Sequence, residues 1–240
     1  MSRIKVRQHV NPLSIIYQQP LIPPDWSVIY PHLSAPIHLD IGSAGGRFLL
    51  ELAQHDREWN YLGVEIRQAL VIQANRIRSE VGVNNLHYIF GNINTSLATL
   101  LASLPSGRLQ RISIQYPDPC FKHRHAKRRV VQPELVNDIA RYLPSGGEVF
   151  LQSDLEWVAQ EMCDRFSENP AFRRTQANWL EPNPLGVPTE REVATLKRGL
   201  PVHRAVYQLT VDSWQLVERS KLPKISSLIQ AWYFWFYEFA

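Results

Sequence analysis

The sequence predicts an α/β fold built on a largely parallel sheet. From about residue 36, short apolar runs alternate with longer segments in which leucine-type residues recur every three or four positions. This alternation is typical of βα units, in which helices connect parallel strands. The first apolar run also ends in a glycine-rich turn that leads straight into a helical pattern. Such a turn lets a ligand lie against bare backbone at a helix N-terminus.

Seven apolar runs are predicted to be strands, because apolar residues alternate or cluster within them and turn residues bound them. They span residues 37–41, 61–64, 86–90, 109–116, 147–152, 172–177 and 202–211. Five segments between the strands have helical spacing: 47–54, 69–81, 96–104, 132–143 and 155–166. The last two strands flank a long segment, 178–192, that contains three prolines and a glycine before a short helix. We expect these two strands to pair antiparallel instead of forming another right-handed crossover.

The 240 residues are expected to form one domain with an appendage at each end. Residues 1–35 form a basic arm and lead-in, residues 36–212 the α/β domain, and residues 213–240 an aromatic-rich C-terminal extension. The extension falls short of the ~20 apolar residues that a membrane span requires. Because the N-terminal residues lack a signal-peptide core, we expect a cytoplasmic protein, either a monomer or a homodimer.

Composition limits the kinds of partner. Lysine and arginine total 26 against 22 acidic residues, which gives a formal net charge of only +4. Any interaction with nucleic acid must therefore depend on local clusters of charge. The two cysteines, Cys120 and Cys163, occur without a CxxC or Cys/His ligand pattern. The sequence therefore predicts no structural zinc site, no disulfide framework and no bound metal.

The first three strand ends carry polar groups suited to binding a small ligand. Gly42 allows a tight turn, and Asp40 just before it adds a negative charge that suits a sulfonium better than a pyrophosphate. Glu65 follows 23 positions after Gly42, where a carboxylate can accept hydrogen bonds from ribose hydroxyls. Asn92 and the Ile93 amide can contact an adenine edge. Because the glycines do not fit G-x-G-x-x-G, S-adenosylmethionine is favoured over NAD, with a plain turn and a surface charge as the alternative.

The stretch 117–129 places a rigid carboxylate beside a basic run. Asp118 lies between two prolines, whose rings restrict the backbone on both sides. The cations that follow it are Lys122, Arg124, Lys127, Arg128 and Arg129. A carboxylate can recognise hydrogen-bond donors and cations can bind phosphates, so the stretch indicates a nucleic-acid-modifying enzyme. An ordinary proline turn beside a solvated basic face is the alternative.

These motifs occur in order with Ser-Asp at 153–154 and Thr-Glu-Arg-Glu at 189–192. Over about residues 1–212 the chain therefore resembles the bacterial tRNA (guanine-N7-)-methyltransferase family, most specifically through the Pro-Asp-Pro block and the Thr-x-x-Glu motif. The resemblance implies a Rossmann-like, seven-stranded class I S-adenosylmethionine-dependent methyltransferase fold, mostly parallel with an antiparallel last strand. It also implies tRNA as substrate and methylation of guanine N7 at position 46 in the variable loop.

The resemblance assigns a role to each matching residue. Asp118 takes the catalytic position. Donor contacts fall on Asp40, Gly42, Glu65, Asn92, Ile93 and Asp118. Substrate contacts fall on Lys122, Asp154, Thr189, Glu190, Arg191 and Glu192. The residues alone leave another reading open, in which Asp154 and the Thr189–Glu192 pair cap helices.

Three positions depart from the family pattern. Ala44 replaces the middle glycine of the loop, and we expect it to adopt a negative φ. Asn92 stands where many members have Asp, which keeps hydrogen bonding but removes a charge. Cys120 stands where Trp is usual, so a stacking surface is absent at that position.

Guanine N7 carries a lone pair and no proton, so its methylation requires alignment and no general base. We expect Asp118 to orient the base by accepting hydrogen bonds from guanine N1–H and N2–H. Two other functions stay open: an adenine amino-methyltransferase, and a non-catalytic RNA-binding module that has lost the methyl donor.

Overall fold

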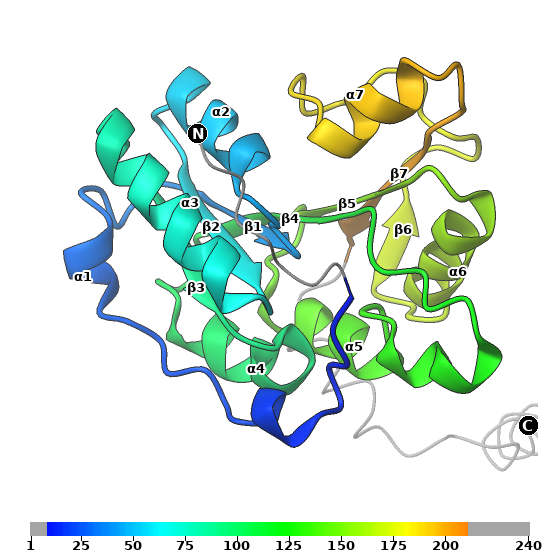
Figure 1. Ribbon diagram of the computed structural model, residues 1–240, viewed down its shortest axis with the longest axis horizontal. Helices are drawn as coiled ribbons and strands as arrows, with labels where there is room; N and C mark the ends of the chain where they lie inside the picture. The colour runs from blue at the N-terminus through cyan, green and yellow to red at the C-terminus, as the bar shows by residue number, and fades with distance from the viewer. Residues whose placement is uncertain (1–8, 211–240) are drawn as a thin grey trace, which may run out of the picture.

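The computed structural model describes residues 9–210, which form a seven-stranded mixed sheet in the order β3-β2-β1-β4-β5-β7-β6 (Figure 1). The strands are β1 (Ile37–Ile41), β2 (Asn60–Glu65), β3 (Leu86–Phe90), β4 (Leu109–Gln115), β5 (Glu148–Ser153), β6 (Phe172–Arg174) and β7 (His203–Leu209). The first five strands pair in parallel, whereas β7 runs antiparallel to both β5 and β6. The predicted fold class, with its antiparallel last strand, is confirmed.

Helices lie around the sheet. The α-helices are α1 (Trp26–Ile29), α2 (Arg47–His55), α3 (Gln68–Val81), α4 (Ile93–Ser103), α5 (Pro133–Tyr142), α6 (Glu156–Ser167) and α7 (Glu190–Leu196), and the 3₁₀ helices are η1 (Ile15–Tyr17) and η2 (His123–Arg128). α4 begins three residues before the predicted segment, because Asn92 caps it by accepting a hydrogen bond from the Asn94 amide (3.2 Å). β6 ends earlier than predicted, at Arg174, because the chain bends at Thr175.

Apolar side chains cover both faces of the sheet. On one face, α2 and α3 pack over β2 and β3 around Phe48 and Tyr88. On the other face, α4, α5 and α6 enclose a larger cluster that includes Ile139. Successive strand residues point to opposite faces, so Tyr61 joins the first cluster and Leu62 the second. Figure 1 shows α2 and α3 on the side of the strands away from α4 and α5.

The helices between residues 9 and 210 include none that is long and apolar enough to cross a bilayer. The expected domain divisions at residues 35/36 and 212/213 stay predictions. Most of the basic arm, residues 1–8, and the whole aromatic extension, residues 213–240, lie outside the described residues.

The glycine-rich turn after β1 packs tightly against β3. Gly46 caps α2 with a left-handed φ of 79°, and its carbonyl accepts a hydrogen bond from the Tyr88 hydroxyl. A Cβ at Gly46 would lie 2.6 Å from the Tyr88 ring. At Gly45, in contrast, a Cβ would meet no atom within 4 Å. The turn therefore tolerates a side chain at Gly45 but not at Gly46.

We expect Gly46→Ala to lower the free energy of unfolding by about 2 kcal/mol or more, because it adds both a left-handed alanine and a steric overlap. Gly45→Ala, the adjacent substitution, should lower it by much less. Urea titrations of both variants beside the wild type measure the difference. Equal losses of stability in the two variants would contradict the packing of Tyr88 on the turn.

Candidate active site

The carboxyl ends of β1, β2, β3 and β4 meet at one edge of the sheet, because these strands pair in parallel. The predicted donor residues lie at or just after the first three ends: Asp40, Gly42, Glu65, Asn92 and Ile93. Asp118 follows β4 at the same edge. Asp40 directly faces β4, since its register partner is Ser113. The structure thus brings all of these residues to one edge.

Asp40 carries a buried carboxylate with a raised pKa. Its Oδ1 accepts a hydrogen bond from the Ser113 hydroxyl (2.6 Å), and the Gln115 amide nitrogen lies 3.5 Å away. Burial raises the pKa of Asp40 to about 6; the hydrogen bonds from Ser113 and Gln115 oppose this shift, and the negative charge of Glu65 adds to it. An ionised Asp40 is therefore destabilised here unless a cation lies beside it.

Glu65 ties the glycine-rich turn to Arg67. Its Oε2 accepts hydrogen bonds from the Ala44 amide (2.9 Å) and from Arg67 Nη2 (3.0 Å). Its Oε1 accepts from the Arg67 amide (2.9 Å) and from Arg67 Nε (2.8 Å). Four hydrogen bonds use the full acceptor capacity of a carboxylate. The buried Glu65 carboxylate is therefore fixed in place, with no spare acceptor site in this arrangement.

The turn itself differs from expectation at Ala44. Its φ is 48°, so the prediction of a negative φ was wrong. The hydrogen bond from the Ala44 amide to Glu65 stabilises this left-handed conformation, which costs a non-glycine residue about 1–2 kcal/mol. Gly42 is also left-handed (φ 85°), with open space where a Cβ would stand. The Ser43 hydroxyl is buried and has no hydrogen-bond partner among residues 9–210. The turn thus offers open backbone at Gly42, whereas the Ser43 hydroxyl is enclosed.

Asn92 connects the N-terminal lead-in to this edge. Besides capping α4, its side-chain amide donates to the carbonyls of Pro12 (3.0 Å) and Tyr17 (3.2 Å). An ionised aspartate in this position would have no hydrogen to donate to these carbonyls. The departure from the family pattern thus coincides with a lead-in held against the start of α4. Ile93, the first residue of α4, is buried beside it.

The segment around Asp118 is constrained by more than its prolines. Tyr116 and Cys120, on either side of the Pro-Asp-Pro unit, have left-handed φ values of 48° and 43°. The Asp118 side chain is 37% exposed; its Oδ1 accepts from the Cys120 amide (3.0 Å), and its Oδ2 lies 2.6 Å from His9 Nδ1. Partial burial tends to raise the pKa of Asp118, but the hydrogen bonds from Cys120 and His9 outweigh it and hold this pKa below its usual value. Asp118 is therefore an ionised carboxylate open to solvent.

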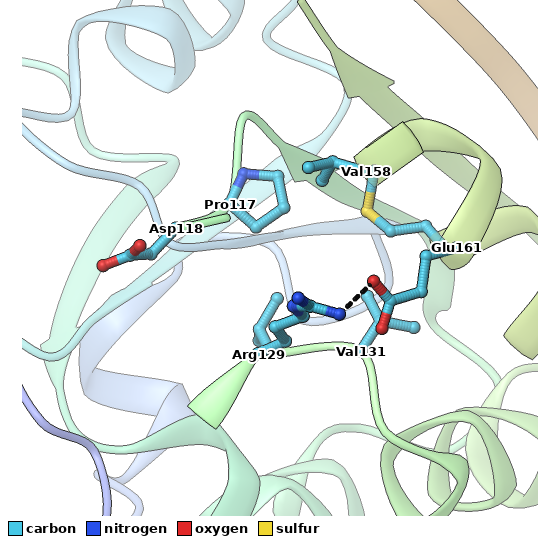
Figure 2. A pocket seen from close by; sticks show the side chains of 8 residues that line it. Pro117, Asp118, Arg129, Val131, Val158 and Glu161 are labelled. Carbon is cyan, nitrogen blue, oxygen red and sulfur yellow. Dashed lines mark hydrogen bonds and ion pairs between the residues drawn. The ribbon is translucent and has the colours of Figure 1, made fainter. Parts of the chain in front are cut away.

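Arg129 links the Asp118 segment to α6. Its guanidinium donates to the Pro119 carbonyl (3.0 Å), forms an ion pair with Glu161 of α6, and lies 4.9 Å over the Trp157 ring. Figure 2 shows the Asp118 carboxylate pointing away from the Arg129–Glu161 pair. A small, mainly apolar pocket adjoins the pair and is lined by Pro117, Asp118, Arg129, Val130, Val131, Val158, Glu161 and Met162. Arg129, predicted with the phosphate-binding cations, thus braces the loop.

The rest of the basic run is turned to solvent. Lys122 precedes η2, and Arg124 and Lys127 lie on it; all three are exposed, and Arg128 is half-buried. These four cations lie four to ten positions after Asp118 along the chain. The basic run is therefore divided between one structural cation and a cationic surface.

The capping alternative is confirmed for Thr189 and Glu192. The Thr189 hydroxyl accepts from the Glu192 amide (3.1 Å), and the Glu192 carboxylate completes the capping box. Glu192 is only 2% exposed and forms an ion pair with the buried Arg204 (2.7 Å). Gln152 donates to Glu192 (3.1 Å) and accepts from Arg204 Nε (2.6 Å). The Glu192 carboxylate therefore anchors α7 to β5 from inside the protein.

Asp154, Glu190 and Arg191 lie on the outer side of this junction. Arg191 donates two hydrogen bonds to Asp154 (2.9 and 2.6 Å). Asp154 does not cap α6, because Leu155 is the N-cap residue. Glu190 forms an ion pair with Arg47 at the start of α2 (2.9 Å). The first turn of α7 thus connects the start of α2 to the end of β5.

Three contacts of this site were missed by sequence reasoning. Arg67 follows Glu65 by two positions, a spacing that could have indicated their pairing. The contacts of His9 with Asp118 and of Arg204 with Glu192 join residues 109 and 12 positions apart. No local pattern carries such pairings, because only the fold brings these side chains together.

Solved structures share this architecture. The 16S rRNA methyltransferase KamB superposes with a TM-score of 0.53 at 16% identity, covering 77% of this chain and 90% of that protein. The [4+2]-cyclase SpnF superposes with a TM-score of 0.50 at 12% identity, covering 77% of this chain and 78% of that protein. At such identities the likeness shows the fold alone.

The seven-stranded fold is that of the class I methyltransferases, and residues 34–205 match the family described as putative methyltransferase. The chain belongs to the tRNA (guanine-N7-)-methyltransferase family, as the sequence motifs predicted. The protein of that name from Trichormus variabilis is 59% identical over 206 residues, which are 85% of this chain and 96% of that protein. Its counterpart from Synechocystis sp. is 56% identical over 211 residues, 88% of this chain and 100% of that protein.

Asp40 predicts a pH-dependent stability. Its pKa of about 6 in the folded protein exceeds its ordinary value of 3.8, so the folded state binds this proton more tightly than the unfolded state. Ionisation of Asp40 therefore costs nothing below about pH 4 and lowers the free energy of unfolding by about 3 kcal/mol above about pH 6. Asp40→Asn should remove this loss, so its stability relative to the wild type should rise between these pH values. Urea titrations across this range measure the effect, and parallel pH profiles for the two proteins would contradict it.

Proposed function

We propose that the protein transfers the methyl group of S-adenosylmethionine to N7 of guanine at position 46 in the tRNA variable loop. Family membership supports the chemistry, and one structural observation carries the proposal. Asp118 is an ionised, partly exposed carboxylate on a strained loop, between the acidic edge formed by Asp40 and Glu65 and the cationic surface of η2. Asp118, which can accept hydrogen bonds from a base, thus adjoins a sheet edge suited to a cation and a surface suited to phosphates.

The sheet edge fits the methyl donor. The sulfonium and amino groups of the donor are cationic, and the raised pKa of Asp40 marks a buried carboxylate that a cation would stabilise. The open space at Gly42 leaves room for its polar groups. When bound, the donor supplies an electrophilic methyl carbon. The residues that would hold it are Asp40, Gly42, Glu65, Asn92, Ile93 and, at the margin, Asp118.

Glu65 must exchange partners to accept hydrogen bonds from ribose hydroxyls. Its four acceptor positions are filled, three of them by Arg67. We expect the Arg67 guanidinium to release Glu65 while the two amide contacts stay. Arg67 is 22% exposed, and its charge also acts on Asp118. After it releases Glu65, the Arg67 guanidinium therefore still interacts electrostatically with the Asp118 carboxylate.

Asp118 orients the guanine and does not remove a proton. Its lowered pKa keeps both oxygens available as acceptors at neutral pH, so they can receive the guanine N1–H and N2–H. Alignment of this kind can lower a barrier by ~7–11 kcal/mol when the reacting atoms are well placed. The negative charge also offsets the positive charge that develops on the purine as N7 is alkylated. His9 occupies Oδ2, so an incoming guanine displaces it.

The remainder of the tRNA contacts two surfaces. Phosphates bind the exposed cations of the basic run, which begins at Lys122. On α7, Glu190 and Arg191 are exposed and can contact the substrate directly. Asp154, Thr189 and Glu192 contribute by fixing the position of α7. These contacts need only one chain, and they are compatible with a monomer or a homodimer in the cytoplasm.

Two tRNA transcripts that differ only in guanine or adenine at position 46 of the variable loop test this function. We expect labelled methyl groups to reach the guanine transcript alone and nuclease digestion to yield 7-methylguanosine. Recovery of N6-methyladenosine would instead establish an adenine amino-methyltransferase. Binding of tRNA with no calorimetric response to S-adenosylmethionine would favour the non-catalytic RNA-binding module.

We expect Asp118→Asn to lower kcat/KM for tRNA by about 100-fold or more, because it removes the charge and one of the two acceptors. The Kd for S-adenosylmethionine should stay nearly unchanged, since Asp118 lies at the margin of the donor edge. Methyl-transfer kinetics and calorimetry measure the two quantities. Asp164→Asn, which changes an exposed carboxylate on α6, is the matched control and should keep full activity. Wild-type kinetics in the Asp118 variant would exclude the orienting role.

A further inference from the structure

Two aromatic side chains lie exposed beside the Asp118 segment. Phe121, on the same loop, is 72% exposed, and Trp157, in the first turn of α6, is 41% exposed. Their ring centroids are 6.0 Å apart, and the ring planes are inclined by 52°. Neither side chain belongs to the two apolar clusters that cover the faces of the sheet. Exposed apolar surface of this kind is typical of binding sites.

Arg129 connects the two elements that carry the aromatic residues. Its guanidinium lies 4.9 Å over the Trp157 ring and is ion-paired with Glu161 on the same helix. The same guanidinium donates to the Pro119 carbonyl in the loop that carries Phe121 (3.0 Å). The loop and α6 are therefore fixed relative to each other. The Trp157 ring, which packs against Arg129, therefore loses little conformational freedom when a ligand binds.

The charges near the two rings suit a polyanion. Lys122 adjoins Phe121 in sequence, and Arg124 and Lys127 are exposed on η2. Of the nearby carboxylates on α6, Glu161 is paired with Arg129, whereas Glu156, next to Trp157, is exposed and leaves the three cations in excess. Exposed aromatic faces beside cations bind unpaired nucleotides, because bases stack on the rings while phosphates contact the cations. Charge and ring exposure thus favour RNA as the occupant of this surface.

We propose that Phe121 and Trp157 form a stacking site for an unpaired base that neighbours the target guanine. The inference rests on the proposed function and adds a contact that holds the RNA beside Asp118. Asp118 and Phe121 lie three residues apart on one loop that Arg129 fixes, so the proposal places the target guanine and the stacked base close together along the same RNA strand. The stacking surface that Cys120 lacks is thereby supplied by the next residue and by α6.

Substitutions at Phe121 separate stacking from apolar contact. With tRNA affinity measured by filter binding at fixed salt and without donor, Phe121→Ala and Phe121→Leu should each weaken binding about tenfold. Phe121→Tyr should bind like the wild type, because it keeps the aromatic face. Val28→Ala, which shortens a side chain 80% exposed on α1, is the matched control and should also bind like the wild type. Full affinity in the Leu or Ala variant would overturn the proposal.

Trp157 provides a second test on a different element. Trp157→Phe keeps an aromatic face, whereas Trp157→Leu does not, so the Phe variant should bind tRNA more tightly. Thermal unfolding of both variants shows whether the contact with Arg129 has been disturbed equally. Equal affinities at equal thermal stability would remove Trp157 from the stacking site and overturn the proposal as stated.

Abasic RNA identifies the ligand. A tRNA that lacks only the base on the 5′ or the 3′ side of the target guanine should bind the wild type about tenfold more weakly in one of the two cases. With that RNA, Phe121→Ala should cause no further loss. Additive losses with both RNAs would show that no neighbouring base occupies the site. Affinity is measured without methyl transfer, so these results test the stacking site separately from the proposed function. Stacking without methyl transfer would refute the proposed function alone. Methyl transfer without stacking would refute the stacking site alone.

Discussion

Parallel pairing of β1 with β4 is the constraint on which the site depends. It aligns Asp40 with Ser113 and directs the chain that leaves β4 toward Asp118 at the same edge. The pKa values of these two carboxylates shift in opposite directions because the side chains differ in burial and hydrogen bonding. Asp40 is buried and its pKa is raised, whereas Asp118 is partly exposed and its pKa is lowered by hydrogen bonds. One sheet edge thus provides a carboxylate that a cation would stabilise and another that keeps its charge at neutral pH.

Backbone strain at this edge is held by side chains. Ala44, Tyr116 and Cys120 are the non-glycine residues with positive φ within residues 9–210. Each such conformation costs about 1–2 kcal/mol, so other contacts must stabilise it. The Ala44 amide donates to Glu65, and the Cys120 amide donates to Asp118. The carboxylates assigned to ligands therefore also fix the turns that carry the ligand sites, which couples the local fold to the chemistry.

Local patterns predicted the elements of the fold because periodicity and turn residues are local properties. The strand Leu86–Phe90, for example, has the bounds that the sequence predicts. For the candidate site, the sequence predicted which residues lie at the ends of the strands but not the contacts between their side chains. The contact between His9 and Asp118 spans 109 positions, and no periodicity encodes it. The positive φ of Ala44 is stabilised by a hydrogen bond to Glu65, 21 positions away, so the expectation of a negative φ for this alanine was wrong.

Both carboxylates assigned to ligands already contact groups of the protein: Arg67 on Glu65, and His9 on Asp118. A ligand that binds either carboxylate therefore replaces a contact within the protein. It does not pair with a carboxylate that was previously hydrated only by water. The net gain at each carboxylate is consequently small, which is consistent with the proposal that stacking and phosphate contacts supply most of the affinity. Specificity follows from the same exchange. In the proposed complex guanine would replace the His9 contact with two donors, whereas adenine lacks N1–H and N2–H and would displace His9 without compensation, leaving Asp118 with the Cys120 amide as its partner.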